Sequence, residues 1–260
     1  MTEGGKGIGF GHITRCIALY ETFEKKGIKP YFIVNADNNV KALLKGKRNK
    51  IFNWLKKKGE LFNLVSGADI VIIDSYLAKK DLYGEIAGMA KLAVYIDDNK
   101  RISYPEGTVI NGSVNAKELE YPDEKGVSYL LGAKYLALRR EFWDAPRKKI
   151  GKQINSVMIT FGGDDARGMT PKILRWLADS YPNLTKNIIT GNGFKNIKKI
   201  EDSKDDRTVI SYYPDVKAMK RIMLNSDMAI SAGGQTLYEL ARIGVPAIAV
   251  AIAKNQLNNI

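Results

Sequence analysis

Short apolar runs rich in β-branched residues alternate along this chain with segments of helical periodicity. Each run is apolar throughout, which is typical of a strand covered on both faces and hence of parallel sheets with crossover helices. The runs predict strands at residues 31–35, 69–74, 92–97, 108–111, 157–161, 187–190, 208–211, 227–231 and 247–251. The pattern therefore predicts an α/β protein.

Helices are predicted between these strands, and three are well marked. The first follows His12, where apolar residues recur at helical spacing up to a stop at Gly27. The second starts near Thr170, and the third starts near Gln235 and ends at Gly244.

The polar stretch 144–153, which carries a proline and a glycine, is the best candidate for a domain linker. It divides the chain into an N-terminal domain, 1–145, and a C-terminal domain, 154–260. Both parts show the same α/β rhythm. We therefore expect two Rossmann-like domains whose parallel sheets face each other across a cleft, where a ligand would bind.

Composition narrows the class of protein. The 260 residues are 45% hydrophobic, which excludes a disordered or collagen-like chain. The longest apolar stretch, 246–253, is far shorter than the ~20 residues of a membrane span, and no cleavable leader is recognisable. We therefore expect a soluble, cytoplasmic protein.

Metal chemistry is limited by the side chains available. The chain has one cysteine, Cys16, and one histidine, His12, so an internal disulfide, a cysteine-based metal site and a multi-histidine centre are excluded. Any metal would be a carboxylate-bound ion such as Mg²⁺. We expect no cofactor.

The net charge of +13 indicates an anionic partner. Nucleic acid, an acidic membrane surface and a phosphorylated small molecule all fit this charge. Eight basic residues and no acid lie between Lys41 and Lys58, with apolar residues interleaved as on the buried faces of helices. A solvated basic face is the simpler interpretation, and contact with a membrane or polyanion is the alternative.

A glycine-rich segment, 4–11, precedes His12 and the first helix. Gly9 and Gly11 allow a ligand to approach the backbone, and the helix start, with Arg15 in its first turn, favours an anion. His12 could act as a general base or acid, and the positive end of the helix would keep it neutral. A tight turn with an incidental histidine is the alternative.

Polar residues follow two strands in the N-terminal half. Because the carboxyl ends of parallel strands line one edge, Asp74 and Tyr76 would face the same crevice as His12. Asp74 could orient His12, and Tyr76 could contact a substrate. For Asp97 and Asp98 a simple turn is at least as good an interpretation.

Two glycine pairs in the C-terminal half also follow strands and precede helices. Gly162 and Gly163 would turn backbone amides toward a phosphate, whereas Asp164 and Asp165 suit a turn better than an Mg²⁺ site. The second segment could bind a diphosphate without the help of a metal ion. It comprises Ser231, Ala232, Gly233, Gly234 and Gln235.

Three further polar residues near that second segment are candidates for ligand contacts. Glu239 could bind the two hydroxyls of a ribose, or simply face solvent near a helix start. Asn255 and Gln256 are uncharged amides suited to sugar hydroxyls, or they form a polar loop. Glu239 thus joins the candidate nucleotide site, and Asn255 and Gln256 are candidate substrate-binding residues.

Four separated motifs together resemble one family. They are residues 9–16, 72–76, 131–142 and 230–239 followed by Asn255 and Gln256. The combination resembles the UDP-sugar hydrolases of the pseudaminic acid pathway and their relatives in spore-coat polysaccharide synthesis, which are of the two-Rossmann-domain glycosyltransferase (GT-B) type.

The resemblance implies an activity. Enzymes of this kind hydrolyse UDP-2,4-diacetamido-2,4,6-trideoxy-β-L-altropyranose to UDP and the free sugar without a required metal. It implies that His12 activates the attacking water, that Tyr76 is an active-site residue, and that Glu239 with residues 231–235 binds UDP. Ser75 stands where the family commonly has a histidine, so one contact in the sugar pocket is expected to differ.

Terminal elements of the family are expected to be absent, since only three residues precede Gly4 and no helix follows Gln256. A glycosyltransferase with the same donor is the nearest alternative activity. A non-catalytic nucleotide-sugar-binding protein is another, and nucleic-acid binding is the weakest because no motif supports it. We expect a UDP-sugar as the partner, no nucleic acid, and a monomer.

Overall fold

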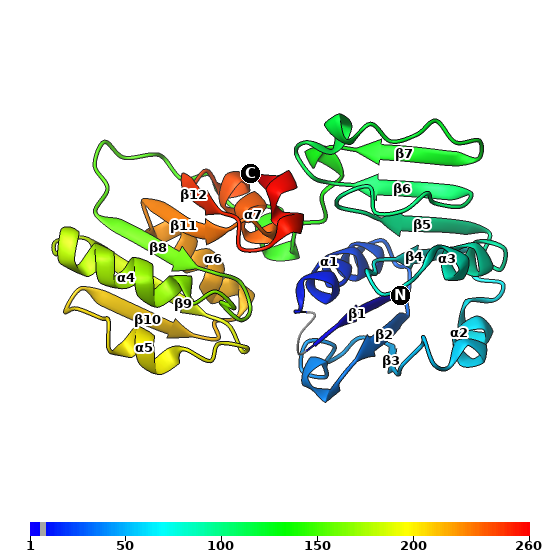
Figure 1. Cartoon of the computed structure of the whole chain (residues 1–260), viewed down its shortest axis with the longest axis horizontal. Helices are drawn as coiled ribbons and strands as arrows, with labels where there is room; N and C mark the ends of the chain where they lie inside the picture. The colour runs from blue at the N-terminus through cyan, green and yellow to red at the C-terminus, as the bar shows by residue number, and fades with distance from the viewer. Residues whose placement is uncertain (6–8) are drawn as a thin grey trace. The chain divides into compact units, whose positions relative to one another are not determined.

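The computed structural model describes residues 1–5 and 9–260, apart from the side chain of residue 255. The chain divides into two compact units, unit 1 (Met1–Arg139) and unit 2 (Arg140–Ile260) (Figure 1). Each unit is described by itself below. Lys6, Gly7 and Ile8 of the predicted glycine-rich segment lie outside the described residues.

Unit 1 alternates strands and helices. Its strands are β1 (Thr2–Gly4), β2 (Phe32–Ala36), β3 (Asn49–Ile51), β4 (Ile70–Ile73), β5 (Leu92–Ile96), β6 (Gly107–Asn111) and β7 (Val127–Leu131). Its α-helices are α1 (Gly11–Lys25), α2 (Lys58–Val65) and α3 (Lys80–Ala87), with short 3-10 turns η1 (Asn38–Val40), η2 (Ala116–Leu119) and η3 (Ala133–Tyr135).

The strands of unit 1 form two parallel sheets, β1-β2-β3 and β4-β5-β6-β7. A parallel bridge between Thr2 and Asp74 joins them, and the Met1 amine donates to the Ile72 carbonyl over 2.7 Å. The combined order is therefore β3-β2-β1-β4-β5-β6-β7, in which the direction of winding reverses between β1 and β4. In such a doubly wound sheet the reversal is where ligands bind, at the carboxyl ends of the strands.

The three residues before the glycine-rich segment do form a strand. Thr2 and Gly4 pair with Val34 and Ala36 of β2, and the Trp54 indole N–H donates to the Thr2 carbonyl. Thr2 and Glu3 are fully buried. This short strand aligns the start of α1 with the end of β4.

Two apolar cores cover the faces of this sheet. On one face α1 packs Ile13, Cys16 and Tyr20 against Phe32 and Val34. On the other face α2 and α3 contribute the buried residues Leu61, Val65, Leu82, Tyr83 and Ile86. Because both faces are covered, the strands are apolar throughout, as the sequence pattern predicted.

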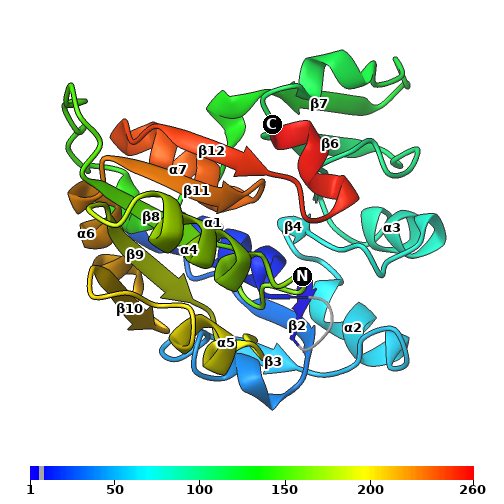
Figure 2. The same ribbon diagram turned by 60° about the vertical axis from the view of Figure 1, so that its left-hand side comes forward.

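Unit 2 repeats this design. Its strands are β8 (Ser156–Thr160), β9 (Thr185–Thr190), β10 (Thr208–Tyr212), β11 (Met228–Ala232) and β12 (Ala247–Val250). Its helices are α4 (Met169–Ser180), α5 (Ile197–Glu201), α6 (Val216–Asn225) and α7 (Gln235–Ile243), with 3-10 turns η4 (Arg140–Phe142) and η5 (Lys254–Asn259). The parallel order β10-β9-β8-β11-β12 again reverses beside the first strand (Figure 2).

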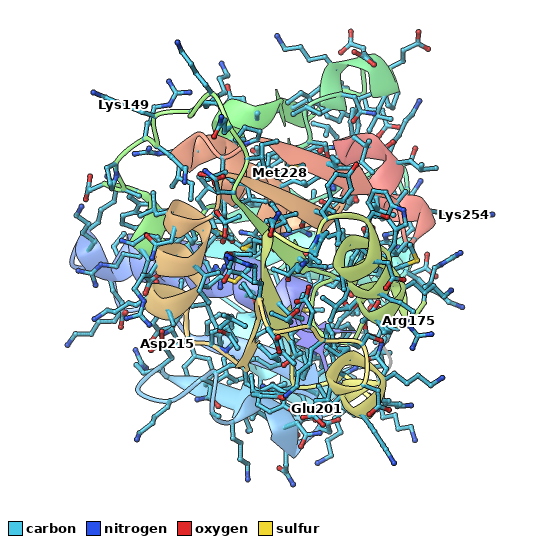
Figure 3. The ribbon with its side chains drawn as sticks, turned by 90° about the vertical axis from the view of Figure 1, so that its left-hand side faces the viewer. Lys149, Arg175, Glu201, Asp215, Met228 and Lys254 are labelled. Carbon is cyan, nitrogen blue, oxygen red and sulfur yellow. The ribbon has the colours of Figure 1, made fainter. Side chains whose placement is uncertain are left out.

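The helices of unit 2 also cover both faces of its sheet. Buried residues of α4 and α5 form one core, and those of α6, α7 and η4 form the other. Charged side chains such as Lys149, Arg175 and Glu201 are exposed around the unit (Figure 3). Both units therefore have the same layered α/β construction.

The α/β class, the nine predicted strands and the three marked helices are confirmed. Strands β1, β3 and β7 and the remaining helices were not predicted individually. The interpretation of 41–58 as helical faces is wrong, because turns and β3 occupy this segment and α2 begins only at Lys58. Trp54 and Leu44 are nevertheless buried, while Leu43 and Leu55 are exposed.

The boundary between the units falls before the predicted linker. Phe142 and Ala145 belong to a core of unit 2. The Arg242 guanidinium donates to the carbonyls of Trp143 and Ala145, which ties this segment to α7. Among the residues that the structure describes, no helix has the length and apolar character needed to cross a membrane.

Candidate active site

The first candidate site lies at the sheet reversal in unit 1. His12 is in the first turn of α1, directly after β1, and Asp74 follows β4. Because β1 and β4 are neighbours, these residues meet although 62 positions separate them: His12 Nδ1 lies 2.6 Å from Asp74 Oδ1. This geometry supports the prediction that Asp74 orients His12.

Arg15 joins this pair from the next turn of α1. Its guanidinium donates to both Asp74 oxygens, from Nε over 2.8 Å and from Nη2 over 2.7 Å, and it also pairs with Asp98. A two-point arginine–carboxylate contact fixes orientation as well as charge. Arg15 therefore holds two carboxylates beside His12.

Tyr76 completes the cluster. Its hydroxyl donates to Asp98 Oδ2 over 2.8 Å, and its ring lies edge-on to the His12 ring with centroids 4.6 Å apart. The four predicted residues His12, Arg15, Asp74 and Tyr76 are thus in contact with one another or with Asp98. We call this set, Asp98 included, the His12 cluster.

Charge and burial set the proton affinities in the His12 cluster. Burial alone lowers the pKa of His12, but the hydrogen bond and charge of Asp74 outweigh it, so this pKa lies above its ordinary value. Against burial, Arg15 and His12 hold the pKa of Asp74 far below its usual range. Asp74 therefore acts against the helix start, which was expected to favour neutral His12.

The contact through Nδ1 also determines which histidine nitrogen can react. With Asp74 an ionised acceptor, Nδ1 carries the proton and donates. No hydrogen bond joins Nε2 to the residues that the structure describes, and 11% of the side chain is exposed. Neutral His12 would therefore present the lone pair of Nε2 to a substrate or to water.

Sequence reasoning missed the role of Glu3, which is buried in β1. Its carboxylate accepts from the Ser75 hydroxyl and from the backbone N–H groups of Tyr76, at 2.5 Å, and Leu77, at 2.9 Å. Glu3 thus shapes the turn that carries Tyr76. Ser75 is buried in this network, so the expected change in a sugar contact at Ser75 does not fit its position.

The two aspartates after β5 divide their roles. Asp97 is buried and accepts from the N–H groups of Asp98 and Asn99 and from the Tyr121 hydroxyl, so it forms the expected turn. Asp98 instead contacts Arg15 and Tyr76. The contacts of Asp98 depend on which strands are neighbours in the sheet. Residue spacing in the sequence does not give this information.

The glycines beside His12 serve the turn into α1. Gly5 and Gly9 exchange two backbone hydrogen bonds of 2.9 Å, and Gly9 has φ +83°, a conformation that favours glycine. A Cβ on Gly4 would lie 2.5 Å from Ile13, so this strand end must stay small. α1 begins without a side-chain cap and without an acid in its first turn, which leaves its start favourable to an anion.

The second candidate site lies at the sheet reversal in unit 2. Gly162 and Gly163 follow β8, and Gly233 and Gly234 follow the adjacent β11. α7 starts after Gly234 with no side-chain cap and no acid in its first turn. These backbone segments share one edge of the sheet.

Close packing shapes the first glycine segment. A Cβ on Gly191 would lie 2.4 Å from the Gly163 carbonyl oxygen, and the Gly193 N–H donates to that same oxygen over 2.8 Å. Asp165 accepts from the N–H groups of Met169 and Thr170 at the start of α4, which agrees with the turn interpretation. The segment is therefore held in one conformation.

The polar side chains around Gly233 are more enclosed than we expected. Ser231 is buried and its hydroxyl donates to the Ala232 carbonyl, while the N–H groups of Gly233 and Gly234 donate to the carbonyls of Val250 and Ala232. Glu239 is 1% exposed, which excludes the solvent-facing alternative. Gln256 accepts from the Ile252 N–H, and its Cβ limits space at Gly233; the Asn255 side chain lies outside the described residues.

Among the described residues, no group of three or more histidine, cysteine or carboxylate side chains is arranged so that it could hold a metal ion. The carboxylates of the His12 cluster are engaged instead by Arg15, His12 and Tyr76. Cys16 is buried with a free thiol whose pKa burial raises to about 12.

The doubly wound units place the chain in a known class of protein. Residues 157–260 match the model of the glycosyltransferase family 28 C-terminal domain. A structure of *Acinetobacter baumannii* MurG matches all of this chain and 81% of its own at 15% identity, with a TM-score of 0.64. *Phytolacca americana* UGT2 matches 99% of this chain and 81% of its own at 10% identity, with a TM-score of 0.61. The chain therefore has the GT-B fold, and its C-terminal part is similar to a glycosyltransferase domain.

Curated relatives confirm the resemblance that the motifs indicated. The *Helicobacter pylori* pseudaminic acid cytidylyltransferase and UDP-2,4-diacetamido-2,4,6-trideoxy-β-L-altropyranose hydrolase is 30% identical over 96% of this chain. The *Bacillus subtilis* spore coat polysaccharide biosynthesis protein SpsG is 24% identical over 98% of this chain and 77% of its own length. The chain spans 43% of the *Helicobacter* protein and 54% of MJ1062 from *Methanocaldococcus jannaschii*, which is 24% identical.

Proposed function

We propose that the chain hydrolyses a UDP-sugar to UDP and the free sugar, with His12 as the general base. The contact of His12 Nδ1 with buried Asp74 is the observation that carries this proposal, because it leaves Nε2 for the proton of water. The name of the *Helicobacter* relative supports a diacetamido-trideoxy-altrose as the sugar.

The proposed reaction is a single displacement. Water attacks the anomeric carbon and gives one proton to His12 Nε2, while the bond from that carbon to the diphosphate oxygen breaks. UDP leaves with the bonding electron pair, and His12 returns its proton to solvent. Attack opposite the leaving group inverts the anomeric centre. Tyr76 contacts the sugar in this proposal, beside Gly9 and Gly11.

The nucleotide would bind at the second site. The segment 231–235, together with Gly162 and Gly163, would hold the diphosphate, whose oxygens would accept from backbone N–H groups and whose charge the start of α7 favours. Glu239 would bind the ribose hydroxyls, and Asn255 and Gln256 would contact the substrate. The start of α7, which has no acid in its first turn, fits a metal-independent reaction.

The direct test is ³¹P NMR of the protein with a panel of UDP-sugars and no acceptor. The panel includes the diacetamido-trideoxy-altrose donor. Release of UDP from that donor supports the hydrolase. Chemical-shift changes without release of UDP would contradict it.

A glycosyltransferase with the same donor site is the second candidate. The match of residues 157–260 to a glycosyltransferase domain and the similarity to SpsG favour it. In a transferase a sugar hydroxyl replaces water, so UDP would be released only after an acceptor is added to the same NMR sample.

The pH dependence of turnover should report on His12. Since a base must be neutral and Asp74 raises the pKa of His12 above 6.5, kcat should rise with pH through a midpoint above that value. In Asp74→Asn the charge is lost while burial remains, so the midpoint should move to lower pH. Stopped assays from pH 5 to 9 measure both midpoints; an unchanged midpoint in Asp74→Asn would contradict this account.

Gly191→Ala should weaken UDP binding. Its Cβ would lie 2.4 Å from the Gly163 carbonyl oxygen, so the backbone at Gly163 must shift away from its amide arrangement. We expect the Kd for UDP, measured by calorimetry, to rise about tenfold or more, since lost charged hydrogen bonds cost about 1.5–3 kcal/mol. Gly59→Ala, at an open helical position, is the matched control and should bind UDP normally.

A further inference from the structure

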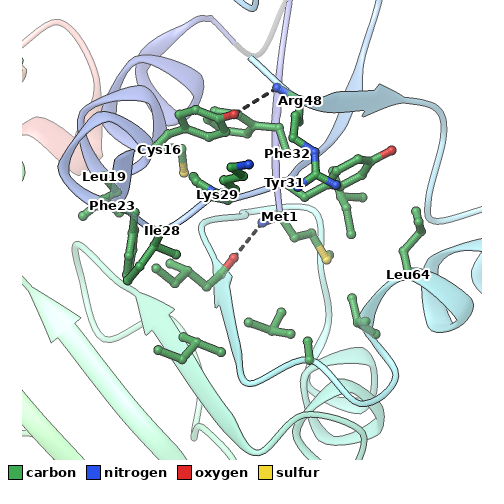
Figure 4. A pocket seen from close by; sticks show the side chains of 18 of the residues that line it. Met1, Cys16, Leu19, Phe23, Ile28, Lys29, Tyr31, Phe32, Arg48 and Leu64 are labelled. Atoms are coloured by element: carbon green, nitrogen blue, oxygen red, sulfur yellow. Dashed lines mark hydrogen bonds between the residues drawn. The ribbon is translucent and has the colours of Figure 1, made fainter. Parts of the chain in front are cut away.

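The two edges of the unit 1 sheet differ in chemical character. At the amino ends of β2 and β4 lies a cavity of about 750 Å³ whose walls are mainly apolar, with Leu19, Phe23 and Ile28 among them (Figure 4). At the carboxyl ends, by contrast, polar side chains connect the turns that follow the strands. One of these connections is made from outside the His12 cluster, by Arg101 and Tyr83.

The backbone of Arg101 is held in the turn that follows β5 and carries Asp98. Its N–H donates to Asp97 Oδ1 over 3.4 Å, and the same oxygen accepts from the Asp98 N–H over 2.9 Å. Asp97 is 1% exposed, so its carboxylate is fixed inside this turn. The backbone of Arg101 therefore has a defined position relative to Asp98.

The side chain of Arg101 reaches the neighbouring turn, which follows β4. Its Nη1 donates to the Ala78 carbonyl over 3.0 Å, and its Nη2 donates to the Tyr83 hydroxyl over 3.0 Å. That hydroxyl donates in turn to the Ser75 carbonyl over 3.0 Å. Arg101 thus holds both ends of the turn after β4, one end directly and the other through Tyr83.

Tyr83 is itself fixed in the core. It lies on α3, is fully buried, and packs edge-on against Tyr95 and Tyr104, with ring centroids 5.4 and 5.6 Å away. The Arg101 guanidinium lies 5.5 Å from the centroid of the Tyr83 ring, which adds a cation–π contact. Burial raises the pKa of Tyr83, so its hydroxyl stays protonated and can donate to the Ser75 carbonyl.

The turn after β4, which carries Tyr76, is held through its donors as well as its acceptors. Glu3 accepts from the N–H groups of Tyr76 and Leu77. The carbonyls of the same turn accept from Tyr83 and Arg101. Because buried backbone groups need such partners, loss of either set would allow the turn to move.

Movement of this turn would be felt at His12. The Tyr76 ring lies edge-on to the His12 ring with centroids 4.6 Å apart, and the Tyr76 hydroxyl donates to Asp98 over 2.8 Å. The contacts form a closed ring, which runs from Asp98 to Arg101, on to the next turn, and back through Tyr76. A change in the separation of the two turns would therefore change the contact between Tyr76 and His12.

We propose that Arg101 is a positioning residue for the candidate active site. Together with Tyr83 it sets the separation of the two turns that carry Tyr76 and Asp98, and it thereby holds the Tyr76 ring against His12. Arg101 acts through these residues and not by contact with the substrate. Its effect on turnover rests on the function proposed above, whereas its effect on the surroundings of His12 does not.

The test uses two variants and a matched control. Arg101→Met removes both side-chain donors, and Tyr83→Phe removes the hydroxyl that joins Arg101 to Ser75. The control is Tyr95→Phe, which removes a hydroxyl of the same aromatic core that donates over 2.8 Å to the Glu106 carbonyl. Each tyrosine variant loses one buried hydrogen bond of the same kind, so the two should show similar, small falls in Tm.

His12 is the one histidine in the sequence, so its ring C–H signals are identified directly in NMR spectra of protein with labelled histidine. Because the Tyr76 ring lies beside this imidazole, the chemical shifts report the position of Tyr76. We expect the signals to move in Arg101→Met and Tyr83→Phe and to stay in place in Tyr95→Phe. Arg101→Lys keeps a charged donor and should move them less.

Turnover of the altrose donor is the second readout. In Arg101→Met kcat/KM should fall about tenfold or more, because a displaced contact group raises the barrier, while Tyr95→Phe should keep wild-type turnover. Unmoved His12 signals in Arg101→Met and Tyr83→Phe would overturn the proposal, as would signals that move equally in Tyr95→Phe. If the signals move as expected but the wild-type protein hydrolyses no UDP-sugar, the proposed function fails and the positioning role of Arg101 stands.

Discussion

His12→Asn should reduce turnover of the UDP-sugar by about 10²–10⁴-fold, the usual contribution of a positioned general base. Asparagine can keep a hydrogen bond to Asp74, but it cannot take a proton from water. The UDP contacts proposed for unit 2 do not involve this residue, so the Kd for UDP should be nearly unchanged. Steady-state kinetics with the altrose donor and calorimetry with UDP measure the two effects.

Two comparisons make this result specific to the base. Tyr76→Phe removes a hydroxyl that contacts Asp98 but leaves His12 intact, so its loss of kcat should be smaller. The residual kcat of His12→Asn should also lack the rise with pH that we assign to the imidazole. Wild-type turnover in His12→Asn would show that the assigned base is wrong.

Arg15→Leu should destabilise the protein strongly. Leucine removes the cation that pairs with Asp74, which is fully buried, and with Asp98. Removing one partner of a buried ion pair typically costs about 3–5 kcal/mol, because the remaining charge stays buried without compensation. For a protein of this size we expect Tm to fall by about 6–20 °C in thermal unfolding followed by circular dichroism.

The chain offers a matched control for this prediction. Lys91 pairs with Asp69 on the surface, where both side chains are more than 70% exposed, so Lys91→Leu should change Tm little. Arg15→Lys keeps the charge but not the two-point geometry, and its Tm should fall between wild type and Arg15→Leu. If Arg15→Leu melts like Lys91→Leu, Arg15 does not hold the cluster together.

The sequence indicated most of the His12 cluster because strand ends are recognisable. Asp74 and Tyr76 follow an apolar run, and parallel strands bring such ends to one edge. Glu3 and Asp98 escaped this reasoning for different reasons. Glu3 stands in a three-residue strand too short to show a pattern, and Asp98 sits in a turn whose other aspartate, Asp97, performs the turn's local role.

Local sequence patterns predicted the structure poorly where buried apolar residues lie in turns instead of helices or strands. The segment from Lys41 to Lys58 has apolar residues at helical spacing, yet Trp54 and Leu44 are buried from turns rather than from helices. Spacing alone records which side chains avoid water, and several backbone conformations satisfy the same requirement.

The amino-acid sequence by itself determined the α/β class, the parallel strands and the strand ends that carry glycines or polar residues, because these follow from apolar periodicity and from the residues that come after each apolar run. Only the tertiary structure decided the proton affinity of His12 and the burial of Ser231 and Glu239. Those properties depend on which charges and atoms surround a group in space. Asp74 lies 62 residues from His12 along the chain and still raises its pKa, because the interaction of buried charges depends on their separation in space.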